Sequence, residues 1–364
     1  MIKRRKVIQL ACGASLASLV PTAQAASDQV PLADAHSHLG LIQRTLRQAD
    51  FLTQAKESGL SLISWCIVPD GPWLKQTNTG IVQASRPGSG QVSVEFKKQL
   101  AAVKGYLADN NIKIALTQSD VDAAMSGEIR VVLSSEAADF VEGDLNKLAE
   151  AQSLGLRHTQ LVHYIESDLG DLQTIAPRHG GLTSLGESVI KECNRLGILV
   201  DLAHCDLSTV NRALDVSSRP MIWSHGWVAP TQGRPDDWIG ILSRRISWDL
   251  AKKITNKGGV IGLWSVGITD ASLSKYPEYP IAIDPQRRLK SYAQGMAQMV
   301  KELGADHVCF GTDMEGVGPI GVVNYYKDLR QVANLLSDAG LNDVEIQKVC
   351  IGNYARVLKQ SLLT

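Results

Sequence analysis

Apolar runs rich in β-branched residues alternate along this chain with longer amphipathic stretches. The near-continuous apolar character of the runs predicts parallel strands that are buried on both faces of a sheet. Eight such strands are expected, at residues 32–38, 62–68, 130–135, 158–163, 198–204, 220–225, 259–264 and 307–311. Helices are expected between most of them, at residues 44–58, 95–108, 143–153, 184–196, 207–216, 248–256, 286–303 and 328–339. This repeated alternation predicts an α/β fold, a single (β/α)8 TIM-type barrel.

Two segments interrupt the alternation of strands and helices. Residues 69–91 follow the second predicted strand, and residues 265–285 follow the seventh. Long loops after barrel strands lie on the catalytic face, where they usually form lids or substrate walls. We expect that role here, with a purely structural insertion as the alternative.

Six imidazole or carboxylate side chains stand at the ends of these apolar runs. His36 and His38 close the first run as His-x-His, and alternation along a strand places both on one face. The others close later runs: Glu136, His204, His225 and Asp313. Barrel enzymes place their chemistry at the carboxyl ends of the strands. Such groups gathered at one mouth can bind Zn²⁺ or a similar divalent ion, so the pattern predicts metal-assisted hydrolysis.

Some of these residues, and some of their neighbours, have simpler interpretations. Asp313 could instead be a helix N-cap, and Cys205, beside His204, could be a thiolate ligand or a core residue; strand alternation favours the core. His158 and His307 begin their predicted strands, which would place them at the opposite end of the barrel. We therefore do not expect either histidine at the metal site.

The N-terminus has the form of an export signal rather than a part of the fold. Residues 1–25 combine a basic start, an apolar stretch and a small-residue cleavage site, which leaves residues 26–364 as the single catalytic domain. The pair Arg4 and Arg5 fits the twin-arginine route, with ordinary secretion as the alternative. Gln9 stands where a lipoprotein signal needs an aliphatic residue, so lipidation of Cys12 is not expected. We expect a periplasmic or secreted protein without a stable membrane span.

Composition argues against one class of function and bears on the state of the cysteines. The chain has 364 residues, 44% of them hydrophobic, and its formal net charge is zero. The chain has no surplus of basic residues, so its charge gives no support for binding to nucleic acid. Five cysteines lie beyond the signal, so at least one is a free thiol: Cys66, Cys193, Cys205, Cys309 and Cys350.

Several linked motifs resemble the renal-type membrane dipeptidases, a branch of the amidohydrolase superfamily. The strongest match is HGGLTSLGESVIKECNRLGILVDLAHCDLSTVNRALDVSSRPMIWSH, which includes His204 and His225. GTDMEG and IGNYARVL resemble two further family segments nearer the C-terminus. The resemblance covers nearly the whole mature chain. It implies a (β/α)8 metallopeptidase fold, two zinc ions per chain, a dipeptide-like small-molecule substrate and a homodimer.

The resemblance also implies roles for individual residues. As ligands of the two metals it gives His36, Glu136, His204 and His225, with Glu136 bridging them. His38 stands where the family has an aspartate, and it is expected to be a ligand because wider amidohydrolases use His-x-His at this place. His163 matches a histidine that contacts the substrate and the tetrahedral intermediate. Asp313 matches the aspartate beside the catalytic water. Arg234 matches the arginine that grips the substrate carboxylate, although a salt bridge with a neighbouring aspartate remains open.

These roles describe a hydrolytic mechanism. A water activated by two zinc ions would attack the peptide carbonyl, with its pKa lowered from about 15.7 towards 7. Asp313 would accept the proton and pass it to the leaving amine. His163 would hydrogen-bond the developing oxyanion, and Arg234 would pair with a substrate carboxylate.

Three positions depart from the family pattern. The family's His-x-Asp is His36-Ser-His38 here, which raises the charge of the site by about one unit and should make a bound water more acidic. Its Glu-Gly-Gly is Glu136-Ala-Ala, and its His-Asn is His163-Tyr164. Ala137, Ala138 and Tyr164 are expected on the substrate side of the site, so these changes bear on which substrate is accepted.

Three functions follow, in order of preference. The first is an exported, metal-dependent dipeptidase. The second is another amidohydrolase that acts on N-acyl amino acids, lactams or lactones. The third is a metal-binding or maturation protein without hydrolase activity. Zinc is the default ion for these ligands, although Mn²⁺, Fe²⁺ and Co²⁺ accept the same donors.

Overall fold

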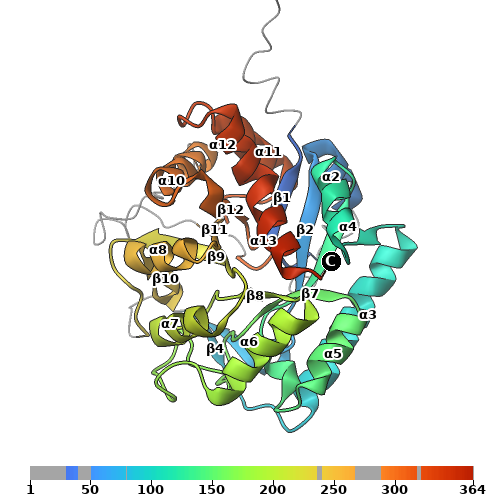
Figure 1. The fold of residues 1–364 in the computed structure, drawn as a ribbon, viewed down its shortest axis with the longest axis vertical. Coiled ribbons are helices and arrows are strands. Elements are labelled where there is room, and N and C mark those ends of the chain that lie inside the picture. Colours follow the sequence, from blue (N-terminus) through green and yellow to red (C-terminus); the bar gives the residue numbers. More distant parts are fainter. Residues whose placement is uncertain are drawn as a thin grey trace, which may run out of the picture.

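The strands form a barrel with helices around it (Figure 1). The structure is a computed structural model that describes residues 30–39, 51–78, 80–235, 240–266, 288–317 and 321–363. Eight parallel strands lie side by side in the order β1 (Leu32–Ser37), β2 (Leu60–Ile67), β6 (Arg130–Ser135), β7 (Leu156–Gln160), β8 (Leu199–Asp201), β9 (Ile222–Ala229), β11 (Val260–Trp264) and β12 (Val308–Gly311).

The first and last strands approach each other just beyond their carboxyl ends. Asp313 N–H donates to the carbonyl of His36, and His38 N–H donates to the carbonyl of Met314, both at 2.9 Å. Deeper in the barrel, the buried Asp34 carboxylate on β1 accepts the N–H of Thr312 at 2.9 Å. The sheet is therefore nearly closed, and the predicted (β/α)8 barrel is confirmed.

Helices surround the strands and cover their outer faces. They are α2 (Phe51–Ser58), α3 (Gln91–Asp109), α4 (Gln118–Met125), α5 (Asn146–Ser153), α6 (Ser184–Leu196), α7 (Leu207–Val216), α8 (Trp248–Asn256), α10 (Arg288–Leu303), α11 (Tyr326–Leu335), α12 (Asp343–Gln347) and α13 (Asn353–Ser361). The expected helices appear within a few residues of their predicted bounds. Of the helix expected at 44–58, only the part from Phe51 lies within the described residues. Helix α4 was not predicted.

Helix α13 closes the amino end of the barrel. Its Tyr354 and Leu358 pack against Leu62 and Leu199, which lie near the starts of their strands. A small buried cluster fills this end, separate from the larger cluster between the strands and the outer helices. With one end plugged, the carboxyl ends of the strands form the accessible mouth.

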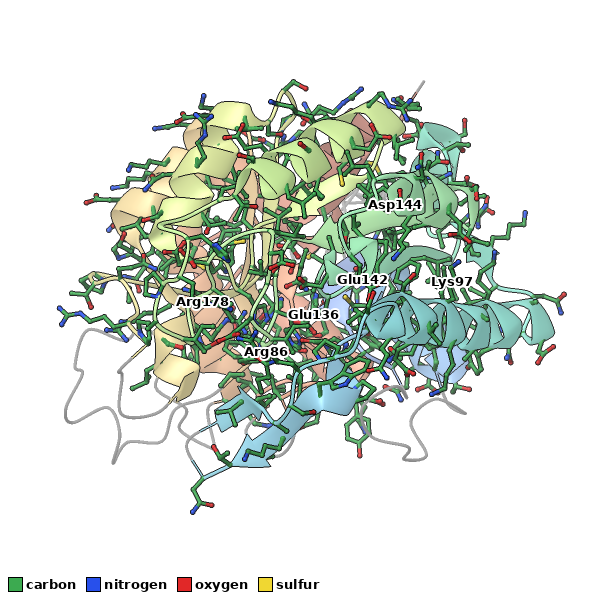
Figure 2. The ribbon with its side chains drawn as sticks, turned by 90° about the horizontal axis from the view of Figure 1, so that it is seen from below. Arg86, Lys97, Glu136, Glu142, Asp144 and Arg178 are labelled. Atoms are coloured by element: carbon green, nitrogen blue, oxygen red, sulfur yellow. The ribbon has the colours of Figure 1, made fainter. Side chains whose placement is uncertain are left out.

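The segment at 69–91 contains an antiparallel hairpin that the sequence did not predict. It consists of β3 (Leu74–Thr77) and β4 (Gly80–Gln83), entered through a short 3₁₀ turn. Gln83 accepts the N–H of Glu166 at 3.0 Å. Arg86 and Arg178, both labelled in Figure 2, form ion pairs with the Glu166 side chain. The contacts of Gln83 and Arg86 fix the end of the hairpin against the loop that follows β7, and the Arg178 ion pair lies within that loop. The other long segment, 265–285, lies mostly outside the described residues.

His158 lies away from the carboxyl ends of the strands, as expected. It is the third residue of β7, which begins at Leu156, two residues before its predicted start. Its buried ring lies inside the barrel, with Nε2 3.3 Å from the Asp201 carboxylate and Nδ1 3.2 Å from the Tyr354 hydroxyl. It is therefore an interior residue, below the strand ends.

Among the described residues, every cysteine is a free, buried thiol. Burial raises the pKa of the Cys205 thiol well above its usual range, as expected of a core residue. No helix in the described part of the chain is long and apolar enough to cross a membrane.

Candidate metal centre

The mouth of the barrel holds a cavity of about 460 Å³. Its floor consists of histidines, carboxylates and aromatic side chains, and the β3–β4 hairpin supplies part of its wall. Figure 2 labels Glu136 near the middle of the molecule as seen from below. The lining includes His38, Glu136, His163, His204, His225, Arg244, Trp264 and Asp313.

Backbone turns at the strand ends aim these side chains into the mouth. Glu136 directly follows β6, and His204 and Asp313 follow β8 and β12 within three residues. His204 and Asp313 have φ values of +72° and +53°, and Ala137 beside Glu136 has +87°. Non-glycine residues rarely adopt this left-handed conformation, and such residues cluster at active sites and ligand clamps. His225 differs, because β9 continues past it to Ala229.

Glu136 joins two groups of potential metal ligands, which we call the first trio and the second trio. The first trio is His36, His38 and Glu136, and the second is Glu136, His204 and His225; all five residues are buried. Glu136 Oε2 lies 3.1 Å from His38 Nε2, and Oε1 lies 2.9 Å from His204 Nε2. Oε1 also lies 3.6 Å from Nε2 of both His36 and His225.

These spacings fit metal ions. A tetrahedral zinc ion with bonds of about 2.0–2.1 Å holds neighbouring ligand atoms about 3.3 Å apart. The distances from Glu136 to its histidines, 2.9 to 3.6 Å, lie on both sides of that value, and His36 Nε2 and His38 Nε2 are 3.0 Å apart. Each trio therefore converges on a point that one divalent ion can occupy, with Glu136 shared between the two points.

Hydrogen bonds on the far side of each ring orient the ligand nitrogens. His38 Nδ1 lies 3.0 Å from the carbonyl of Cys66, which fixes the proton on Nδ1 and leaves Nε2 for the cavity. His225 Nδ1 is 2.9 Å from the Ser224 hydroxyl. Partners of this kind hold metal-ligating histidines in one tautomer and one ring orientation.

Charge states at the centre also suit cation binding. Burial lowers the pKa of His36, His204 and His225 well below the usual range, so these rings are neutral donors. Burial alone would raise the pKa of Glu136, but the imidazoles of His163, His38 and His36 lower it well below normal. Against burial, Glu136 and Asp313 raise the pKa of His38 well above normal. The carboxylates therefore create a strongly negative potential at the first trio.

Asp313 lies beside the first trio. Its Oδ1 is 3.1 Å from His38 Nε2 and 3.8 Å from His36 Nε2. Its Oδ2 accepts the indole N–H of Trp264 at 2.9 Å. The residue caps no helix in the described structure, so the alternative interpretation as an N-cap is not supported.

His163 faces the centre from beyond β7. Its Nε2 lies 3.3 Å from Glu136 Oε2, and its Nδ1 lies 2.9 Å from both carboxylate oxygens of the buried Asp70. Burial would lower the pKa of His163, but Asp70 and Glu136 outweigh that effect and raise it. Asp70 holds the Nδ1 proton and so directs Nε2 into the cavity. Sequence reasoning missed Asp70, although it stands just after the second apolar run.

The structure separates Arg234 from this centre. Arg234 is exposed and does not line the cavity, whereas Arg244, at the end of a 3₁₀ turn, lines it and is 1% exposed. Arg244 donates from Nη2 to His225 Nε2 at 3.1 Å, and its Nη1 lies 3.5 Å from the Tyr164 hydroxyl. Of the two arginines, Arg244 is the one that lines the cavity.

Comparison with known proteins agrees with this geometry. Residues 21–363 match the sequence family described as membrane dipeptidase, peptidase family M19. Dipeptidase aclJ of Aspergillus oryzae is 29% identical over 238 residues, which cover 64% of this chain and 51% of that protein. Dipeptidase verJ of Clonostachys rogersoniana is 27% identical over 254 residues, 68% of this chain and 60% of that protein. The chain spans 51–65% of the length of the curated relatives it matches.

Solved structures share the fold over almost the whole chain. The probable dipeptidase PvdM from Pseudomonas aeruginosa superposes with a TM-score of 0.73 at 19% identity, over 93% of this chain and 97% of that chain. A metallo peptidase from Rhodobacter sphaeroides, liganded with a phosphinate mimic of the dipeptide L-Ala-D-Ala, gives 0.69 at 19% identity, over 92% and 100%. The sequence match extends over nearly all of the chain, and this protein therefore belongs to the membrane dipeptidase family, peptidase family M19.

Proposed function

We propose that this protein is a metal-dependent dipeptidase that uses two zinc ions. The observation that carries the proposal is Glu136, which joins two histidine pairs at one barrel mouth beside Asp313. Four imidazoles and one carboxylate are a ligand set that zinc prefers. Family membership supports the choice of dipeptides among amidohydrolase substrates.

In this proposal the metal ligands, Asp313 and His163 each serve a different part of peptide hydrolysis. Bound at the two trios, the ions would lower the pKa of an attacking water and polarise the scissile carbonyl. Asp313 Oδ1, turned toward the first trio, accepts the proton and delivers it to the leaving amine. His163 directs Nε2 toward the same space and donates to the oxyanion, with Asp70 stabilising the positive charge on the ring.

Arg244 anchors the substrate in this proposal, in place of Arg234. A buried guanidinium can form two parallel hydrogen bonds with a carboxylate, and the loss of water around it strengthens them. The C-terminal carboxylate of a dipeptide is the group that fits this anchor. In the structure Arg244 Nη2 donates to His225 Nε2. We expect this hydrogen bond to be given up when His225 Nε2 binds an ion, which leaves Nη2 free to donate to the substrate carboxylate.

A second candidate function is hydrolysis of another amide, lactam or lactone on the same scaffold. The observation that favours it is Ala137, which follows Glu136 at a φ of +87° and is 1% exposed. The family resemblance has glycine at this position, so the added methyl group occupies buried space next to Glu136. Tyr164 lies near Arg244 and changes the same wall.

Export is part of the proposal and rests on the signal-like residues 1–25, which lie outside the described structure. Five buried free thiols are compatible with a protein that folds before export, since none needs an oxidising compartment.

The test is metal content together with hydrolysis of L,L and L,D dipeptides by the purified protein. About two zinc ions per chain with dipeptide turnover support the proposal. Two ions with turnover only of N-acyl amino acids or lactams favour the second candidate. Protein without tightly bound metal and without hydrolase activity would favour the non-enzymatic role over both hydrolase functions.

A further inference from the structure

We propose that Trp264 is a positioning residue that couples the substrate anchor Arg244 to the proton acceptor Asp313. The inference rests on the proposed function, because it takes the roles of these two residues from there. It adds a residue to which neither the sequence nor the family resemblance assigned a role.

The first contact fixes the carboxylate. Trp264 Nε1–H donates to Asp313 Oδ2 at 2.9 Å, and both residues are buried. An indole has one donor and no acceptor, so this hydrogen bond uses its full capacity. With Oδ2 engaged, Oδ1 is held toward His38 Nε2 at 3.1 Å, where a proton would be received. Without the indole, the Asp313 carboxylate could rotate away from that direction.

The second contact fixes the guanidinium. The Arg244 guanidinium carbon lies 5.0 Å from the centroid of the Trp264 ring, within the range of a cation–π interaction. The indole therefore meets the positive group with its negative face and the negative group with its positive N–H edge. A single rigid ring therefore contacts both the Arg244 guanidinium and the Asp313 carboxylate.

The indole itself is held firmly. Trp264 is the last residue of β11, and its backbone pairs with Gly311 on β12. The ring of Trp227 packs against it at a centroid distance of 5.1 Å, and the His225 ring lies at 5.7 Å. The barrel wall thus sets the separation between the group that anchors a carboxylate and the group that accepts the proton. A substrate anchored on Arg244 would place its scissile bond at a fixed distance from Asp313.

Two substitutions separate the two contacts. Trp264→Phe keeps an aromatic face for Arg244 and removes the N–H, so we expect kcat to fall about 10–100-fold with KM within about threefold of wild type. Trp264→Leu removes the face as well, so KM should rise further, by about 2–30-fold. Trp65→Phe is the matched control, since it makes the same change in a buried indole that lies outside the cavity lining and whose N–H has no hydrogen-bond partner in the described part of the chain; we expect its kcat to stay close to wild type.

A double variant tests whether Trp264 acts through Asp313. If it does, Trp264→Phe lowers kcat no further in an Asp313→Asn background. A second full loss of kcat in that background, or a Trp264→Phe enzyme as active as Trp65→Phe, would overturn the proposal. Bound zinc and melting temperature, measured for each variant, separate misfolded protein from a true loss of positioning.

A spectroscopic measurement keeps the test independent of turnover. The indole N–H resonance of Trp264 is identified in a ¹⁵N–¹H spectrum by its absence from Trp264→Phe. We expect it to move when Asp313 becomes Asn, because a charge-assisted hydrogen bond is weakened. An unmoved resonance would contradict the contact. If the wild type hydrolyses no dipeptide, the proposed function fails while this spectrum still decides the Trp264–Asp313 contact.

Discussion

The two trios share Glu136 but face opposite charges. The first trio has the Asp313 carboxylate beside it, with Oδ1 3.1 Å from His38 Nε2. The second has the Arg244 guanidinium beside it, with Nη2 3.1 Å from His225 Nε2. Both trios are buried, so these charges are poorly screened. The same types of ligand therefore stand in two different electrostatic environments.

This difference suggests a division of labour between the trios. Unit charges about 4 Å apart interact by about 4 kcal/mol at an effective dielectric of 20. The carboxylate should favour an ion at the first trio, and the guanidinium should disfavour one at the second. We expect the first ion to bind more tightly, close to the proton acceptor, and the second to lie on the side where the substrate is anchored.

Removing the shared ligand should have the largest effect. Glu136→Gln replaces the carboxylate that serves both trios, so we expect both ions to be lost and kcat to fall on the order of 10⁴-fold or more. Metal analysis and dipeptide hydrolysis measure the two losses. Glu150→Gln, on the surface of α5 and paired with Lys97, is the control for loss of one carboxylate. Retention of two ions by Glu136→Gln would contradict the shared site.

Asp313→Asn should separate proton transfer from metal binding. The amide keeps the shape and can still accept the Trp264 hydrogen bond, but it takes up no proton. We expect kcat to fall about 10²–10⁴-fold while both ions remain. Measured loss of one ion together with activity would show that Asp313 acts mainly as part of the first metal site.

Arg244→Met tests the charge beside the second trio. Hydrogen bonds to a charged group contribute about 1.5–3 kcal/mol, so KM for dipeptides should rise about 10–100-fold. The second ion should also bind more tightly once the guanidinium is gone. The matched control is Arg234→Met, which removes an exposed arginine outside the cavity. If Arg234→Met raises KM and Arg244→Met does not, the original assignment of Arg234 holds.

The contrast between these two arginines shows what the sequence could predict. The barrel and its metal-ligand candidates were predictable because strand ends are local features, and parallel strands bring their carboxyl ends together. Choosing Arg244 over Arg234 depends on the path of the chain between them, which includes the undescribed residues 236–239. A short 3₁₀ turn at Gly240–Arg244 places Arg244 at the cavity.

Contacts between residues far apart in the sequence could not be predicted, for a similar reason. Asp70 and His163 are 93 positions apart in the chain, and Trp264 and Asp313 are 49 apart. No periodic pattern connects such residues. Their contacts arise only when β2 and β7, or β11 and β12, bring their ends to the same mouth. The β3–β4 hairpin was also missed, because Leu74–Gln83 lacks the buried apolar character that marks the barrel strands.

His38→Asp should give the smallest and most selective change. It restores the carboxylate that the family resemblance places on β1, so the first ion should bind about tenfold more tightly while the second is little affected. Stepwise removal of metal by a chelator measures both affinities, and the second step is the internal control. The added negative charge should also raise the pKa of the attacking water and move the acidic limb of the pH–rate profile to higher pH. Equal changes in both metal affinities would mean that the trios are not electrostatically distinct. Such a result would contradict the different effects expected of the Asp313 carboxylate and the Arg244 guanidinium.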